Sequence, residues 1–353
     1  MGDRGRRRAG RAQGAVLSDL TALNLFEQQA RNRRHTALWI AAFIMFFAWI
    51  GFGADLVLYL GSHDAYGTPG YRFPWIGVIS TGIALIATWN AWSRGPRQVL
   101  AAAGAREVEN PQSFEEKQLV NVVEEMSIAA GLPRPRIYIV EDEDPNAFAT
   151  GYGPEQASVA VTRGLLKVLN REELQGVIAH EMAHVRNFDV RLMTMIAALV
   201  GVIVLLSDVL GRFLRHGGLR FGGGRGKKGG AGAIVIVVLV LWLITLILAP
   251  LITRLMAMAV SRNREYLADA TGAELTRNPA ALAEALRKIE GHVAPTKSIR
   301  RSTAHLCIAD PLGRAVNAKE GGLSNLFGTH PPMPKRIARL RGMAFQQLKA
   351  AGQ

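Results

Sequence analysis

The sequence has little of three things: cysteine, acidic residues, and an apolar run at its very start. Cys307 is the single cysteine, so no disulfide forms within the chain and a disulfide-stapled secreted fold is excluded. Lysine and arginine number 42 against 28 acidic residues, a net charge of +14. Such a surplus is typical of chains that meet nucleic acid or the anionic inner face of a membrane.

The first 35 residues are mostly polar and include eight arginines. The first apolar run begins only after them, and no small-residue cleavage site follows, so we do not expect a signal peptide. We expect residues 1–35 to form a disordered basic tail. Beside an apolar span, such a tail is best interpreted as a topological anchor attracted to anionic lipid.

Four apolar stretches approach or reach the roughly 20 helical residues that cross a bilayer. They are Thr36–Leu60, Pro74–Trp92, Leu192–Leu210 and Ala233–Thr253. The alternative for each is a buried core helix, and the short third stretch, which continues from a polar helix, fits that alternative best. As membrane spans they form two hairpins, and the polar remainder then lies on one side of the membrane.

This reading divides the chain into five parts: the tail 1–35, a first hairpin 36–92, a first catalytic part 93–190, a second hairpin 191–253 with a Gly-rich loop 211–232, and a second catalytic part 254–353. Apolar periodicity predicts a helix over Pro111–Ala130. Strands are predicted at Arg136–Glu141, Asn146–Thr150 and Ser158–Thr162, and a helix from Arg171.

That last helix carries the sequence His180-Glu181-Met182-Ala183-His184, an H-E-x-x-H motif. Four residues advance a helix by about 400°, so both imidazoles project from one face and can bind one ion. Glu181 projects about 100° away from His180, where it can activate a water without being a ligand. Zinc suits two imidazoles with a carboxylate and keeps a position open for water, so the motif predicts a zinc hydrolase.

A catalytic zinc needs a third protein ligand, and Glu265 and Asp269 are the first candidates. They are four residues apart, so they share a helical face, and one can bind the metal while the other orients a ligating histidine. The alternative is a solvated charged face that pairs with Arg262 and Arg264. Spacing alone does not decide between these interpretations, nor which carboxylate touches the metal.

With these motifs in place, the chain resembles the HtpX-type membrane metalloproteases, which belong to the same wider group as the CAAX prenyl protease and the mitochondrial protease Oma. The resemblance covers residues 36–345. It is carried by residues 144–151, by the metal motif with Asn187 and Asp189, by residues 264–269, and by Thr329-His330-Pro331-Pro332 with Arg336-Ile337. Two features depart from it: the long arginine-rich tail and the six basic residues of the loop 211–232.

The resemblance implies that Glu265 is the third ligand of one zinc ion per subunit and that Asp269 supports His180. It implies that an edge strand at Asn146, Ala147, Phe148 and Ala149 pairs with the backbone of a polypeptide substrate, a mode with loose side-chain selectivity. His330 would help to stabilise the oxyanion, although a rigid turn before Pro331-Pro332 is its alternative. Arg336 would anchor that segment or assist the same site.

The expected fold is α+β and mainly α: a zincin-like metalloprotease domain with a small sheet, interrupted by two transmembrane hairpins. Basic residues flank the spans on the catalytic side, which predicts a multi-pass protein of the cell (inner) membrane with a cytoplasmic active site. The basic loop 211–232 conflicts with this topology unless the second hairpin does not fully cross. By family analogy we expect quality control of misfolded membrane proteins.

Two other function classes compete with a protease. A zinc-dependent scaffold could bind unfolded segments without cutting them, but such a scaffold would not need Glu181. A membrane-anchored nucleic-acid binder would use the basic tail, but that tail lacks interleaved aromatic residues and the chain carries no recognised nucleic-acid motif. The sequence does not predict the oligomeric state.

Overall fold

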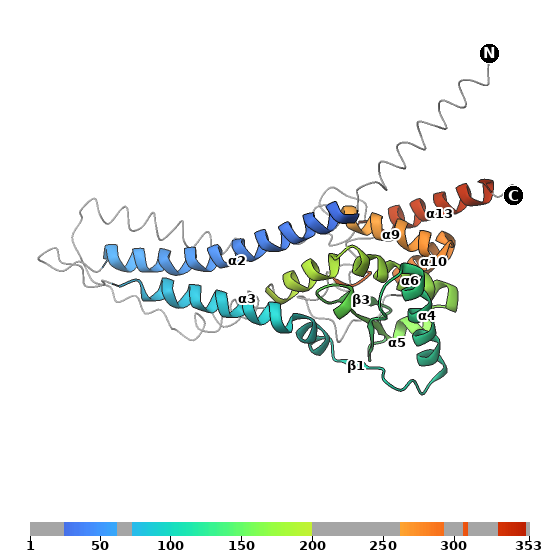
Figure 1. Cartoon of the computed structure of the whole chain (residues 1–353), viewed down its shortest axis with the longest axis horizontal. Coiled ribbons are helices and arrows are strands. Elements are labelled where there is room, and N and C mark those ends of the chain that lie inside the picture. Colours follow the sequence, from blue (N-terminus) through green and yellow to red (C-terminus); the bar gives the residue numbers. More distant parts are fainter. Residues whose placement is uncertain (1–24, 62–72, 200–261, 293–305, 310–330, 351–353) are drawn as a thin grey trace, which may run out of the picture.

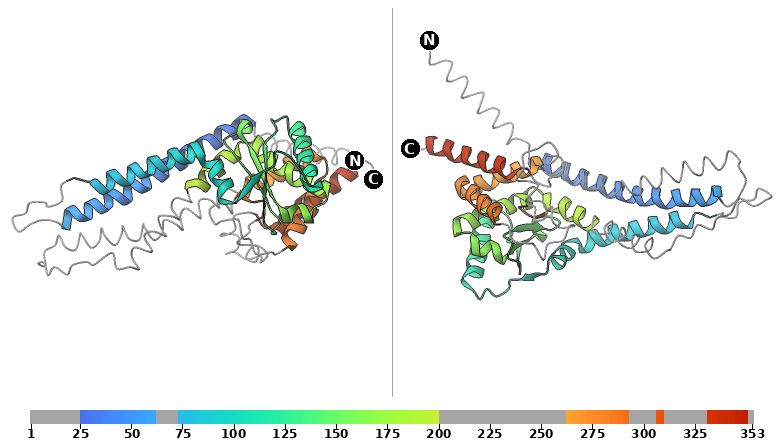
Figure 2. Two further views of the ribbon diagram at one scale, coloured as in Figure 1. Left: turned by 90° about the horizontal axis from the view of Figure 1, so that it is seen from below. Right: turned by 180° about the vertical axis from the view of Figure 1, so that it is seen from behind.

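The computed structural model describes residues 25–61, 73–199, 262–292, 306–309 and 331–350. A long pair of helices projects from a compact unit in which helices surround a small sheet (Figure 1). The two further views show the same arrangement, with the helix pair extending well beyond the sheet (Figure 2). The described part is therefore mainly helical with a small mixed sheet, which confirms that much of the predicted fold class.

The projecting pair consists of α2 (Leu25–Gly61) and α3 (Trp75–Ala102), which pack against each other. Residues Arg34–Leu60 and Trp75–Ala102 are long and apolar enough to cross a membrane. Only 17% of the most apolar window of each is buried, which is unlike the core helix of a soluble protein. Many large apolar side chains are exposed along the pair, among them Leu38, Met45, Trp49, Ile79, Ile86 and Trp89.

Asp55, the one charge in the first predicted span, is buried between these helices. Its carboxylate accepts hydrogen bonds from the backbone N–H groups of Ile76 and Gly77, at 3.1 and 2.6 Å. These donors belong to the first turn of α3, where helical N–H groups have no partner within their own helix. Asp55 therefore caps its neighbouring helix, which explains a carboxylate in an apolar segment.

Tyr152 ties α3 to the compact unit. Its hydroxyl accepts a hydrogen bond from Gly95 N (2.9 Å) and donates one to Ala91 O (2.7 Å), one turn apart in α3. Pro96 follows directly and has no N–H to donate, so the helix ladder is already interrupted at this point. The hydroxyl satisfies backbone groups at the interruption and fixes α3 to the turn after the third strand.

The sheet has the order β1-β2-β4-β3, with β1 Ala105–Glu107, β2 Arg136–Val140, β3 Ala147–Thr150 and β4 Ser158–Thr162. β2 and β4 are parallel, and both outer pairings are antiparallel. The strands predicted over Arg136–Glu141, Asn146–Thr150 and Ser158–Thr162 are confirmed to within one residue at each end. β1 was missed because three residues, Ala-Arg-Glu, carry no strand pattern.

The compact unit also contains α4 (Phe114–Ala130), α5 (Arg163–Val168), α6 (Arg171–Arg186), α9 (Arg262–Thr276), α10 (Pro279–Gly291) and α13 (Met333–Ala350), with a short 3₁₀ turn η1 (Pro154–Gln156). α4 starts three residues later than predicted, because Ser113 caps it by accepting the N–H of Glu116. α6 packs against α4, α9, α10 and β3, so it runs through the core.

The second predicted hairpin lies largely outside the described residues. Residues 189–199 are helical and continue from the end of α6 after a short turn. Thr194 in this segment bonds Thr150 Oγ1 at 2.9 Å and accepts the N–H of Gly151, so it closes one end of β3. The remainder of the predicted hairpin, from residue 200, and the basic loop 211–232 are not described.

Candidate metal centre and active site

The two histidines of the motif project from the C-terminal half of α6. The helix begins with a capping box, in which Asn170 accepts the N–H of Glu173 and the Glu173 side chain accepts the N–H of Asn170. His180, Glu181 and His184 are all buried, with 4% exposure or less. Three ionisable side chains within one helical stretch are therefore withdrawn from water together, which is unusual without a ligand or strong partners.

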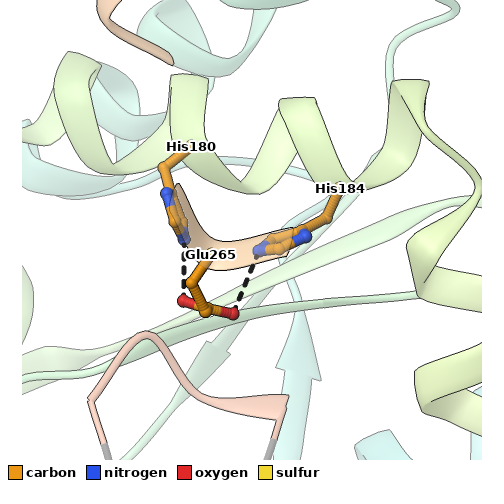
Figure 3. A group of neighbouring side chains, drawn as sticks. All are labelled: His180, His184 and Glu265. Carbon is orange, nitrogen blue, oxygen red and sulfur yellow. Dashed lines mark ion pairs between the residues drawn. The ribbon is translucent and has the colours of Figure 1, made fainter. Parts of the chain in front are cut away.

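α9 brings a carboxylate to these histidines. Glu265 Oε2 lies 3.7 Å from His180 Nε2, and Glu265 Oε1 lies 3.6 Å from His184 Nε2. Figure 3 shows both rings pointing down from α6 onto this carboxylate. The close approach depends on Gly272, because a Cβ atom there would lie 3.1 Å from the backbone nitrogen of His180.

These three side chains fit a divalent metal ion. One ligand atom from each of His180, His184 and Glu265 lies within 4.8 Å of the others. The 3.6–3.7 Å separations exceed ordinary hydrogen bonds but suit atoms that share one ion about 2 Å away. Two imidazoles and one carboxylate are also the donor set of many catalytic zinc sites.

Asp269, one turn after Glu265, lies behind His180. Its Oδ1 is 3.1 Å from His180 Nδ1, the ring nitrogen that faces away from Glu265. Arg336 of α13 is fully buried and donates two hydrogen bonds to this carboxylate, at 2.7 and 2.9 Å. Arg336 also lies 3.3 Å from Glu265 Oε2 and donates to Ile308 O. The guanidinium therefore joins α13, α9 and residues 306–309 beside the histidines.

Burial and charge act in opposite directions on the pKa values of this group. Burial alone would lower the pKa of His180, but the carboxylates of Asp269 and Glu265 outweigh it and raise that pKa to about 9. Burial raises the pKa of Glu181 above its usual range, and the two histidines oppose that rise. Burial would raise the pKa of Asp269 as well, but Arg336 and His180 hold it below its usual range.

His184 has a carboxylate partner of its own, Asp189, to which no role was assigned from the sequence. Asp189 Oδ2 lies 3.2 Å from His184 Nδ1, so Nε2 is the nitrogen left facing Glu265. Asp189 is 1% exposed and lies just after the turn that ends α6. The available signal was its place among the residues that carry the resemblance, five positions after His184.

The predicted substrate strand is β3, at the end of the described sheet. Thr162 N donates to Asn146 O, and Ala147 is opposite Val161. In an antiparallel pair, main-chain N–H and C=O groups point alternately toward the neighbouring strand and away from it. Those of Asn146 and Phe148 therefore point toward β4, and those of Ala147 and Ala149 point outward. The outward O of Ala147 already accepts the N–H of Ile308, at 2.9 Å.

The remaining predicted residues fall into two groups. The Asn146 side chain donates to Ala309 O, and the Phe148 side chain is buried in an apolar cluster that includes Val99 and Leu100, so both have structural contacts. His330 lies outside the described residues, and its role stays a prediction. For Arg336 the resemblance implied that it anchors its segment or assists the site; its guanidinium bonds to Asp269 and Ile308 O, and the choice between these roles stays a prediction.

Comparison with known proteins identifies relatives along most of the chain. Residues 113–344 match the model of peptidase family M48. A protein named "Protease HtpX homolog" from Thermoanaerobacter pseudethanolicus is 44% identical over 91% of this chain and 98% of its own. A protein of the same name from Streptococcus gordonii is 41% identical over 90% of this chain and 100% of its own.

Among solved structures, the crystal structure of S. mikatae Ste24p covers 86% of this chain and 66% of its own, with 17% identity and a TM-score of 0.44. The matched residues 113–344 include the buried group His180, His184 and Glu265. The chain belongs to peptidase family M48 and, within it, to the HtpX-type membrane metalloproteases.

Proposed function

We propose that the protein is a zinc metalloendopeptidase in which His180, His184 and Glu265 hold the metal. The observation that carries this proposal is the convergence of these three buried side chains from α6 and α9 within 4.8 Å. When bound, zinc would polarise the scissile carbonyl and lower the pKa of a water to about 7. The stoichiometry we expect is one zinc ion per subunit.

Glu181 is the general base. It follows His180 directly on α6, so it leaves the helix beside the ligands without competing with them. It accepts the proton of the attacking water and passes it to the leaving amine.

The substrate is a polypeptide that pairs with the outer edge of β3. Of the four predicted residues, Ala149 and Ala147 direct main-chain groups outward, and Ala147 O is already bonded to Ile308. Pairing therefore centres on the N–H and C=O of Ala149. Asn146 and Phe148 keep the strand in place, the first through Ala309 and the second through its buried ring. Backbone pairing would accept many sequences.

His330 donates a hydrogen bond to the oxyanion of the tetrahedral intermediate. Replacing one such donor typically lowers kcat about 10²- to 10³-fold. His330→Ala should show a loss of this size with unchanged zinc content. A His330→Ala protein that cleaves as fast as the parent would restrict this residue to a structural turn.

The protein works at the cytoplasmic face of the cell membrane, with its basic residues near anionic lipid, and removes misfolded membrane proteins. The distribution of basic residues around the spans supports the cytoplasmic face. The contact of Asn32 with Asp189 supports a single side for the start of α2 and the metal site. Quality control rests on family analogy.

A decisive test measures zinc and cleavage together. The full chain, purified in detergent, should hold one zinc per polypeptide and cut an unfolded casein, and a chelator should abolish both. Glu181→Gln should keep its zinc and lose about 10²- to 10⁴-fold in kcat. Zinc-free protein with full activity would refute the metal mechanism, and an active Glu181→Gln would refute the base.

The same inactive variant tests the biological role. Glu181→Gln expressed in cells should trap bound substrates, and quality control predicts several unrelated, damaged membrane proteins. Recovery of one dedicated, well-folded substrate would contradict this role and leave the chemistry intact.

A further inference from the structure

Asn32, near the start of α2, reaches the metal centre from the first apolar helix. Its Nδ2 donates one hydrogen bond to Asn187 O (2.9 Å) and a second to Asp189 Oδ1 (2.8 Å). Asn187 lies in the turn that ends α6 and Asp189 directly follows that turn, and both are more than 150 residues away along the chain. One amide group therefore connects the start of α2 to the end of the metal-binding helix.

Asp189 passes this contact to a metal ligand. Its second oxygen, Oδ2, lies 3.2 Å from His184 Nδ1, while Oδ1 faces Asn32 and, at 3.5 Å, Arg264 of α9. The carboxylate is 1% exposed, so water contributes little to holding it. Its orientation, and with it the ring orientation of His184, depends on these donors.

We propose that Asn32 is a positioning residue for the metal site, which holds Asp189 so that His184 presents Nε2 to the metal. The proposal rests on the proposed function, because it needs His184 to be a metal ligand. Its consequence is a physical link between the membrane helix α2 and the catalytic metal. A displacement of α2 relative to α6 would then weaken metal binding without altering any ligand.

A purely structural role for Asn32 makes a different prediction. As a clamp between α2 and α6, the amide would affect thermal stability, and any effect of its removal on zinc affinity would be the same with or without Asp189. As a positioning residue, it would affect zinc affinity, and only while Asp189 is present. Replacing the hydrogen-bond partner of a metal-binding histidine typically lowers metal affinity 10- to 100-fold.

The test measures the dissociation constant of Zn²⁺ by competition with a chelator, using the full-length protein in detergent. We expect Asn32→Ala to weaken Zn²⁺ binding about tenfold. Thr36→Val is the matched control. Thr36 is buried one turn along α2, and its hydroxyl donates a hydrogen bond to the backbone O of Asn32 within the same helix. Thr36→Val should bind Zn²⁺ like the parent.

A double-mutant cycle decides between the two roles. In an Asp189→Ala background, Asn32→Ala should weaken Zn²⁺ binding no further, because its target is gone. The proposal would be overturned if the double variant lost affinity by the product of the two single losses, or if Asn32→Ala bound Zn²⁺ like the parent. Asn32→Ser, which is too short to reach Asp189, serves if Asn32→Ala folds poorly. A parent protein that binds no Zn²⁺ would instead refute the proposed function.

Discussion

The two histidines of α6 occupy similar positions but are supported in different ways. His180 faces Asp269, which is bound by the buried guanidinium of Arg336 from the C-terminal helix. His184 faces Asp189, which is bound by the neutral amide of Asn32 from the first apolar helix and lies 3.5 Å from Arg264. One support is a fully buried ion pair with two short hydrogen bonds, and the other is a neutral hydrogen bond of 2.8 Å joined by a longer ion pair, 3.5 Å, with Arg264.

This difference separates two properties of the site. A buried ion pair is strongly destabilising to break, because the remaining charge stays buried without a partner. A hydrogen bond from a neutral amide contributes less to folding, although it still sets the direction of its acceptor. We therefore expect the His180 side to couple the metal centre to the stability of the fold, and the His184 side to tune metal affinity.

The largest expected effect comes from breaking the His180 side. Asp269→Asn would leave Glu265 Oε2, 3.3 Å away, as the charged partner of the buried Arg336, which should lower the free energy of unfolding by about 3 kcal/mol. Thermal unfolding in detergent measures the change. Glu284→Gln is the control, because Glu284 pairs with Arg287 on an exposed face of α10 and should matter little. Equal effects of both changes would contradict the buried-pair interpretation.

The matched change on the His184 side should act on the metal instead. Asp189→Asn keeps the size of the side chain but weakens its interaction with the imidazole, so Zn²⁺ affinity should fall about tenfold. The thermal midpoint of the zinc-free protein should change far less than in Asp269→Asn. A zinc-free Asp189→Asn protein as unstable as Asp269→Asn would remove the distinction between the two sides.

The local parts of this site were predictable from the sequence. The H-E-x-x-H motif, the helical period around it and the start of the helix near Arg171 all depend on neighbours within a few residues. The strand β2 followed from its β-branched and aromatic run Ile-Tyr-Ile-Val, and the short strands β3 and β4 were predicted after it. The four-residue spacing of Glu265 and Asp269 also predicted a shared helical face. The resemblance supplied their roles, with Glu265 as the metal ligand and Asp269 as the support of His180.

The supports of the site were not predictable in the same way. Arg336 and Asp269 are 67 residues apart, and Asn32 and Asp189 are 157 apart. No periodicity relates such positions, because their meeting depends on how helices cross rather than on local conformation. Ile308 reaching Ala147 is a third case, and it changes which part of the predicted substrate strand is open.

Gly272 offers a way to disturb both sides at once. A Cβ at this position would lie 3.1–3.4 Å from the backbone of Ala179 and His180, so α9 would move away from α6 by a few tenths of an ångström. Gly272→Ala should therefore weaken Zn²⁺ binding by separating Glu265 from both histidines, and destabilise the fold by about 1–3 kcal/mol. Gly291→Ala is the control, because a Cβ there meets nothing within 4 Å.

The smallest effect should come from replacing a buried carboxylate outside the site. This change tests whether Zn²⁺ affinity depends only on the residues that contact the two histidines. Glu116 accepts the N–H of Gln112 and bonds to Arg163 and Arg106. The hydrogen bond from Gln112 N–H lowers the pKa of Glu116, and the two arginines lower it further, while burial raises it. The net result is a pKa that falls from 4.5 to about 2. Glu116→Gln should lower stability by about 1 kcal/mol at pH 7 and leave Zn²⁺ affinity unchanged.

The pH dependence of this last change has a definite sign. A depressed folded-state pKa means that the ionised carboxylate stabilises the fold at every pH above about 4.5, and that this contribution disappears as the pH falls toward 2. The difference in thermal midpoint between the parent and Glu116→Gln should thus be constant from pH 7 to 5 and shrink below 4.5. A difference that grows on acidification would mean that Glu116 is destabilised by its surroundings. A fall in Zn²⁺ affinity in this variant would mean that the metal centre senses the general stability of the fold, and the contrast between the two histidines would lose its basis.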